Sequence, residues 1–143
     1  MRRLSVLTVL VLLALAPGTA RAGEALPECR GNLATVVIAL GQEPTPGRDV
    51  IVGTDDADEI HGLGGNDVIC GRGGPDHITG DGGGDSVFGG AGHDWLHGGR
   101  QNDVVADGPG NDTLIGGGGD ADQCRAGNGV ERISPSCEIV SIP

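Results

Sequence analysis

Aliphatic residues recur every nine positions through the middle of the chain, and the residues between them are mainly glycine or polar. The recurring positions are Ile51, Ile60, Ile69, Ile78, Val87, Leu96, Val105 and Leu114. A fixed period of this length predicts a repeat architecture, in which each unit contributes one apolar side chain to a shared core. Before the repeats, the apolar run of residues 33–40 predicts a strand that pairs with the first of them.

The polar positions follow the same period. Aspartate stands two residues before each of these aliphatic residues, without a missed step. The eight aspartates are Asp49, Asp58, Asp67, Asp76, Asp85, Asp94, Asp103 and Asp112. Glycine stands two residues before the aspartate in six of the eight units, and five residues before it also in six. The chain therefore contains a nonapeptide repeat with fixed glycine, aspartate and aliphatic positions.

This unit, G-G-x-G-x-D-x-U-x with U aliphatic, resembles the nonapeptide of the RTX, or haemolysin-type calcium-binding, repeat family. Residues 89–97 fit every fixed position, and the resemblance extends from about residue 44 to residue 125. It implies an all-β fold, a right-handed parallel β-roll in which six residues of each repeat form a turn and three form a short strand. Two nine-residue repeats then make one 18-residue coil.

An 18-residue coil places every second repeat in one stack. The core ladders would be Ile51, Ile69, Val87 and Val105 on one sheet, and Ile60, Ile78, Leu96 and Leu114 on the other. Glycine suits the turns because it adopts φ > 0 and lets backbone carbonyl oxygens approach an ion. The aspartate supplies the anionic oxygen that Ca²⁺ prefers.

The resemblance assigns the ion ligands. One edge of the roll would carry Asp49, Asp67, Asp85 and Asp103, and the other would carry Asp58, Asp76, Asp94 and Asp112. An ion between successive turns then gives three ions on each edge, about six Ca²⁺ in all. Asp122 is a weaker candidate, because the sequence reaches it one residue late. The expected carbonyl ligands are those of Gly62, Gly64, Gly71, Gly73, Gly80, Gly82, Gly89, Ala91, Gly98 and Arg100.

Some units depart from the pattern. Gln101 and Asp107 replace glycine, and we expect them to distort or weaken the sites near them. The first two units have Pro44, Thr45, Thr54, Asp55 and Asp56 where the family prefers glycine. We expect these two units to serve partly as caps.

The net negative charge of the chain opposes folding unless cations neutralise it. Residues 23–143 hold all 20 acidic residues and six arginines, a net charge of −14. This charge disfavours nucleic acid or an anionic membrane as a partner. Six Ca²⁺ ions would nearly neutralise it. We therefore expect calcium to be part of the folded core.

The first 22 residues predict secretion. Arg2 and Arg3 precede the apolar run of residues 4–16, and Ala20-Arg21-Ala22 has the form of a signal-peptidase site. The run is short for a membrane span, which needs about 20 apolar residues. We expect cleavage after residue 22, an extracellular protein and no membrane span after cleavage; a retained anchor is the alternative.

Four cysteines, at positions 29, 70, 124 and 137, fit an oxidising compartment and allow three pairings. We favour Cys29–Cys70, which ties the N-terminal segment to an early repeat, and Cys124–Cys137, which closes a short C-terminal loop. The chain has no C-x₂-C pair, which disfavours a structural zinc site. Because open ends of a repeat array need covering, we expect caps at residues 23–43 and 126–143, on either side of a roll at 44–125.

The pattern offers no catalytic constellation. The histidines at 61, 77, 93 and 97 fall at variable positions, and Ser86 and Ser134 have no neighbouring base in the pattern. We therefore expect a secreted calcium-binding repeat protein that is not an enzyme. The alternative is a calcium-stabilised adhesion or interaction module with an unknown cell-surface or extracellular partner.

Overall fold

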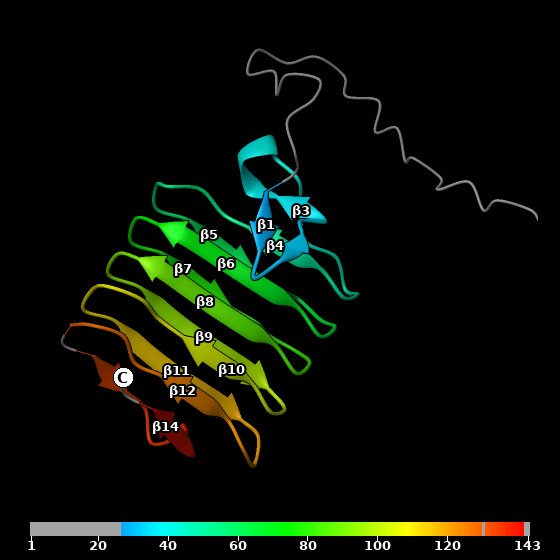
Figure 1. The fold of residues 1–143 in the computed structure, drawn as a ribbon. Coiled ribbons are helices and arrows are strands. Elements are labelled where there is room, and N and C mark those ends of the chain that lie inside the picture. Colours follow the sequence, from blue (N-terminus) through cyan, green and yellow to red (C-terminus); the bar gives the residue numbers. More distant parts are fainter. Residues whose placement is uncertain (1–26, 130, 142–143) are drawn as a thin grey trace, which may run out of the picture.

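The computed structural model describes residues 27–129 and 131–141. The predicted signal peptide lies outside these residues, as does the start of the predicted N-terminal cap. The described chain forms β-strands and one short 3-10 helix, η1 (Ile38–Leu40). The strands lie in two parallel sheets and one hairpin (Figure 1). The all-β fold predicted from the repeat is confirmed.

The two parallel sheets take alternate strands of the chain. The seven-stranded sheet contains β3 (Val36–Val37), β4 (Val50–Val52), β6 (Val68–Gly73), β8 (Ser86–Ala91), β10 (Val104–Ala106), β12 (Gln123–Arg125) and β14 (Ile139–Ser141). The five-stranded sheet contains β5 (Glu59–His61), β7 (His77–Thr79), β9 (Trp95–Arg100), β11 (Thr113–Gly118) and β13 (Arg132–Ile133). Because the chain passes between sheets at each turn, it winds as the predicted parallel β-roll.

Neighbouring strands in the regular part of the roll are 18 residues apart in sequence. In the seven-stranded sheet Ile51 pairs with Ile69, and Ile69 pairs with Val87. In the five-stranded sheet Ile60 pairs with Ile78. The 18-residue coil and the alignment of both aliphatic ladders are therefore confirmed.

One apolar core lies between the sheets. Its fully buried aliphatic members are Ile51, Ile60, Ile69, Ile78, Val87, Leu96, Val105 and Leu114. Each strand from β4 to β11 gives this core one aliphatic side chain, because its neighbours in sequence point to the opposite face. The core is thus two rows of single side chains. It buries little apolar surface to oppose the repulsion among the many acidic residues.

An N-terminal hairpin covers the outer face of the seven-stranded sheet. It consists of β1 (Glu28–Cys29) and β2 (Asn32–Leu33), which pair antiparallel. A second apolar cluster, with Cys29, Val50 and Val52 at its centre, lies between the hairpin and the sheet. The Arg30 guanidinium lies 4.4 Å from the centroid of the Phe88 ring, close enough for a cation–π contact.

Both favoured disulfides are present. Cys29–Cys70 joins the hairpin to β6, with 5.8 Å between the Cα atoms. Cys124–Cys137 joins β12 to the C-terminal segment, with 5.6 Å between the Cα atoms. Each bond therefore links an end of the chain to the roll.

The apolar run of residues 33–40 forms less strand than we expected. Val36 and Val37 pair in parallel with β4, but η1 follows at once. The Gln42 side chain accepts a hydrogen bond from the Val37 N–H at 2.7 Å, and Gly41, with φ of 68°, turns the chain back. This local turn takes the backbone out of the sheet after two residues.

Coil length changes at the C-terminal end. The step is 19 residues from Val104 to Gln123 and also from Thr113 to Arg132, and 16 residues from Gln123 to Ile139. The strands nevertheless stay in register, so the turns absorb the difference. Within the described residues, no helix is long and apolar enough to cross a membrane.

The ladder architecture predicts a large cost for shortening one core side chain. We expect Leu96→Ala to lower the free energy of unfolding in saturating Ca²⁺ by about 2–5 kcal/mol, because a fully buried leucine leaves a cavity. Leu33→Ala is the matched control, since 57% of Leu33 is exposed. Chemical denaturation of both variants measures the difference, and similar losses in the two would contradict the ladder as the core.

Candidate functional site

The repeat aspartates form two columns, one along each edge of the roll. The first column precedes the strands of the seven-stranded sheet and contains Asp49, Asp67, Asp85, Asp103 and Asp122. The second column precedes the strands of the five-stranded sheet and contains Asp58, Asp76, Asp94 and Asp112. Each aspartate ends a turn and begins a strand, so the sheet ladders hold successive members one strand spacing apart, about 4.8 Å.

One hydrogen bond repeats along both columns. The backbone N–H of each aspartate, except the last in each column, donates to Oδ1 of the aspartate in the next coil. In the first column, Asp49 donates to Asp67 and Asp67 donates to Asp85, both at 2.8 Å. The remaining bonds run from Asp85 to Asp103, Asp103 to Asp122, Asp58 to Asp76, Asp76 to Asp94 and Asp94 to Asp112. Each of these carboxylates is therefore held by the coil before it.

The second oxygen of most of these carboxylates is buried without a partner. Within the described residues, Oδ2 has no hydrogen-bond partner in Asp67, Asp76, Asp85, Asp94, Asp103, Asp112 and Asp122. All seven side chains are at most 3% exposed. Buried polar atoms in folded proteins are nearly always satisfied. Seven anionic oxygens in equivalent places therefore indicate repeated cation positions.

The glycine that begins each turn leaves room beside this oxygen. A Cβ on Gly98 would lie 2.6 Å from Asp103 Oδ2 and against the carbonyl oxygen of Gly116, in the next coil. A Cβ on Gly62 would lie 2.9 Å from Asp67 Oδ2 and 2.7 Å from the Gly80 carbonyl oxygen. We call each such space a glycine cradle. It combines a carboxylate from one turn with a carbonyl from the next, a donor set that suits Ca²⁺.

The carboxylate recurs beside the glycine of every turn that begins with glycine, and the carbonyl of the next coil recurs in all of them except the Gly89 turn. The first residues of these turns are Gly53, Gly62, Gly71, Gly80, Gly89, Gly98 and Gly116. The carbonyls of Gly71, Gly80, Gly89 and Gly98, which we expected to be ligands, point toward the cradle of the preceding coil. The residues present therefore fit a column of calcium ions on each edge.

Burial makes the columns electrostatically costly without a cation. It raises the pKa of Asp76 and of Asp85 to about 6, and that of Asp103 to about 7. The backbone N–H of the preceding aspartate lowers each of these pKa values, while neighbouring carboxylates raise them. Burial also raises the pKa of Asp67, Asp94 and Asp112.

The first aspartate of each column has partners within the protein. Asp49 Oδ2 accepts hydrogen bonds from the Thr45 N–H at 2.7 Å and from Thr45 Oγ1 at 2.9 Å. Asp58 Oδ2 accepts from the Thr54 N–H at 2.6 Å and from Thr54 Oγ1 at 3.0 Å. Threonine at a position where the family prefers glycine thus closes the N-terminal end of each column. These bonds favour the prediction that the first two units act partly as caps.

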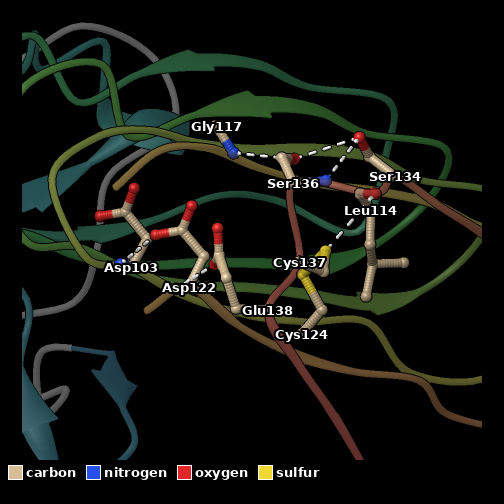
Figure 2. The surroundings of a disulfide bond; sticks show 9 residues. All are labelled: Asp103, Leu114, Gly117, Asp122, Cys124, Ser134, Ser136, Cys137 and Glu138. Atoms are coloured by element: carbon tan, nitrogen blue, oxygen red, sulfur yellow. Dashed lines mark hydrogen bonds between the residues drawn. A yellow bond between two sulfur atoms is a disulfide. The ribbon is translucent and has the colours of Figure 1, made fainter. Parts of the chain in front are cut away.

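Asp122 takes a regular place in the first column despite its shifted sequence position. Its carboxylate is fully buried, and a Cβ on Gly116 would lie 2.7 Å from Asp122 Oδ2 and 2.7 Å from the carbonyl oxygen of Ser136. Figure 2 shows the carboxylates of Asp103, Asp122 and Glu138 side by side, near the Cys124–Cys137 disulfide. The N–H of Asp122 donates to Glu138 Oε2, as other aspartates donate to the next coil.

Sequence reasoning missed three acidic residues at the C-terminal end. Glu138 follows Asp122 in the first column, and Glu131 follows Asp112 in the second, because Thr113 pairs with Arg132. Each glutamate stands two residues before an aliphatic residue, as the repeat aspartates do, and this signal could have identified them. The third residue, Asp107, lies beside Asp112 and Glu131.

Asp107 does not simply replace a glycine. One oxygen from each of Asp107, Asp112 and Glu131 lies within 4.8 Å of the others. Burial raises the pKa of Asp107 to about 6; the Gly127 N–H lies close enough to lower it, and the carboxylates of Asp112 and Glu131 raise it. Neither Asp107 oxygen forms a hydrogen bond of good geometry.

The other expected carbonyl ligands have mixed surroundings. The Gly62 carbonyl accepts from the Gly64 N–H at 3.0 Å, that of Gly82 from the Gly65 N–H at 2.8 Å, and that of Arg100 from the Gly83 N–H at 3.4 Å. The carbonyl oxygens of Gly82 and Ala91 face Gly64 and Gly73 of the preceding coil, 3.6 Å and 3.8 Å from the position of an added Cβ. The role of these carbonyls, and of Gly64 and Gly73 themselves, stays a prediction.

The raised pKa values predict how the metal-free protein responds to pH. A folded-state pKa of about 6–7 against an ordinary value of 3.8 means that the folded state binds protons which the unfolded state has released. The metal-free fold should thus gain stability as pH falls from about 7 toward 4, and lose it as pH rises through about 6–7. Circular dichroism of metal-free protein should show more β-structure at about pH 4.5 than at about pH 7.5. The opposite order would contradict the buried columns.

Comparison with known proteins adds one finding. The family model described as "RTX calcium-binding nonapeptide repeat (4 copies)" matches residues 45–78, 71–105 and 97–130. These matches cover more than half of the chain and nearly all of the roll. A search of curated proteins found no match.

Proposed function

The chain belongs to the RTX calcium-binding nonapeptide repeat family, and we propose that Ca²⁺ bound between its stacked turns drives folding of the roll outside the cell. Calcium binding follows from the family and from the roll. The number and places of the ions, the coupling to folding and the location are the parts that we propose.

A single observation carries the proposal: seven buried aspartates each have an oxygen without a protein partner. Six of the seven face a space that glycine leaves open, and carbonyl oxygens of the next coil line most of these spaces. In the turn of the seventh, Asp112, Asp107 stands in place of the glycine. When bound, Ca²⁺ supplies positive charge and a coordination shell that satisfies several oxygens at once. The chain's own residues position those oxygens through the ladder of N–H to Oδ1 bonds.

The column geometry supports about six ions. Each column has three gaps that begin at a glycine and separate two successive aspartates of the column. In the first column these gaps begin at Gly62, Gly80 and Gly98, and in the second they begin at Gly53, Gly71 and Gly89. The gap expected between Asp49 and Asp67 does not begin at a glycine, because Pro44 begins the Asp49 turn. The gap between Asp103 and Asp122, which begins at Gly98, takes its place in the count.

Without cations, few interactions stabilise the folded roll. Its core is one aliphatic side chain per strand, and its two columns bring carboxylates within about 5 Å of one another. Carboxylates at that distance in a buried setting repel one another strongly. Calcium binding and folding should therefore form one equilibrium, as in other small domains whose metal sites do not exist in the unfolded chain.

We expect the protein beginning at residue 23 to be largely unfolded in a chelator at neutral pH and to become β-rich as Ca²⁺ is added. Half-saturation should fall in the range of extracellular calcium modules, about 10⁻⁴ to 10⁻³ M, or lower where binding is cooperative. Circular dichroism during a calcium titration measures both. An unchanged β-spectrum with a cooperative thermal transition in EDTA would contradict the coupling.

Position in a column should decide how many ions a substitution disturbs. Asp85 lies between two gaps of the first column, whereas Asp49 is held by Thr35 and Thr45 at its end. We expect Asp85→Asn to weaken two ions and Asp49→Asn at most one. Equilibrium dialysis of both variants gives the stoichiometry, and equal losses would be evidence against the two columns.

We propose further that the protein is not an enzyme. The polar side chains that could suggest catalysis have structural partners: His61 lies 3.7 Å from Glu59 and 3.5 Å from Asp81, and His93 Nδ1 accepts from the Asn111 N–H at 2.9 Å. Secretion is supported by the two disulfides, which persist in oxidising compartments.

The second candidate function is calcium-stabilised adhesion or interaction at a cell surface. One observation favours it. The ring centroids of His77 and Trp95 lie 4.2 Å apart, and those of Trp95 and His97 lie 5.7 Å apart, on the outer face of the five-stranded sheet. The partner would be an extracellular or cell-surface molecule that an aromatic cluster can contact.

A further inference from the structure

The fourth turn of the second column differs from the three before it. Gly53, Gly71 and Gly89 begin the earlier turns, and Asp107 occupies the same place in the fourth. In the earlier turns this position is open and faces a single carboxylate. In the fourth turn it brings a second carboxylate to the edge of the roll.

A third carboxylate arrives from the C-terminal segment. The Arg132 N–H donates to the Asp112 carbonyl at 2.7 Å, which aligns Glu131 with Asp112 as the next member of the column. One oxygen from each of Asp107, Asp112 and Glu131 lies within 4.8 Å of the other two. These three residues form the terminal carboxylate cluster.

Four oxygens of the terminal carboxylate cluster are buried without a hydrogen-bond partner. They are both oxygens of Asp107, Oδ2 of Asp112 and Oε1 of Glu131. Asp112 itself is 1% exposed. Within the residues that the structure describes, no arginine or histidine forms an ion pair with any of the three. The anionic oxygens lie close together, and the Gly127 N–H approaches Asp107 without forming a hydrogen bond of good geometry.

The backbone leaves room for this arrangement. A Cβ on Gly127 would lie 2.9 Å from Asp107 Oδ1, and a Cβ on Gly129 would lie 2.9 Å from Glu131 Oε1. Glycine in the last turn therefore lets both carboxylates lie close above the backbone.

We propose that Asp107, Asp112 and Glu131 form a further Ca²⁺ site that closes the second column and binds more tightly than the glycine cradles. This deepens the proposed function and rests on it. At a glycine cradle, only the column aspartates supply negative charge to an ion. At the terminal carboxylate cluster, the Asp107 carboxylate supplies charge in addition to the column residues. A higher count of charged oxygen ligands raises affinity for Ca²⁺ in protein sites. The substitution of glycine by Asp107 thus strengthens this end of the roll, contrary to the expectation from the repeat pattern.

Calcium binding by the protein beginning at residue 23 tests this proposal. Equilibrium competition with a calcium-chelating dye should resolve one ion that binds at least about tenfold more tightly than the rest. Asp107→Asn and Glu131→Gln should each weaken that ion about tenfold or more and leave the others unchanged. Asp107→Gly, which restores the glycine of the repeat, should leave an ion of ordinary cradle affinity.

Asp120→Asn is the matched control, because Asp120 is an exposed acid near the same end of the chain. It should bind like the unaltered protein. Identical binding curves for Asp107→Asn and Asp120→Asn, or the absence of a tighter ion in the unaltered protein, would overturn the site. Failure of the unaltered protein to bind Ca²⁺ or fold with it would instead overturn the proposed function. Circular dichroism in saturating Ca²⁺ establishes that each variant folds, and Asp107→Gly keeps the test decisive should Asp107→Asn not fold.

Discussion

The bond from one aspartate N–H to the Oδ1 of the next coil determines the rest of the site. It holds the buried carboxylates in a fixed orientation, with Oδ1 satisfied and, in most turns, Oδ2 facing the glycine cradle. The parallel ladders set the spacing of about 4.8 Å, so the carboxylates cannot move apart to relieve their repulsion. The backbone geometry that builds the roll therefore also brings the carboxylates together, and cations are needed to neutralise them. The apolar core is too small to offset this repulsion by itself.

Most of the fold could be predicted from the sequence because one period governs both faces of every strand. The nine-residue spacing of Ile69, Ile78 and Val87 predicts that alternate residues belong to the same sheet. In the structure Ile69 pairs with Val87, and Ile78 lies in the other sheet, where it pairs with Ile60. The favoured disulfides also appear, since Cys70 lies on β6 beside the hairpin that carries Cys29. Repetition makes such predictions strong, because each unit repeats the evidence of the others.

The ends of the columns could not be predicted as well, because they depend on contacts that no period encodes. Thr45 and Thr54 look like losses of glycine, yet their hydroxyl and N–H groups satisfy Asp49 and Asp58. Asp122 looks displaced by one residue, but a longer turn restores its place in the column. Asp107 looks like a defect until Glu131 is brought beside it from the C-terminal segment. In each case the turn conformation, which tolerates an extra or a larger residue, decides the outcome.

The polarity of the columns explains why the two ends are closed by different chemistry. Every N–H in a column points toward the next coil, so the first carboxylate lacks a donor from before it and the last N–H lacks an acceptor after it. Threonines supply donors at the N-terminal end, where Thr35 Oγ1 lies 3.2 Å from Asp49 Oδ1. At the C-terminal end, Glu138 supplies an acceptor to the Asp122 N–H, and the Cys124–Cys137 disulfide ties that segment to β12. Donors at one end and carboxylates at the other leave the C-terminal end more anionic, and Asp107, Asp112 and Glu131 lie together at that end of the second column.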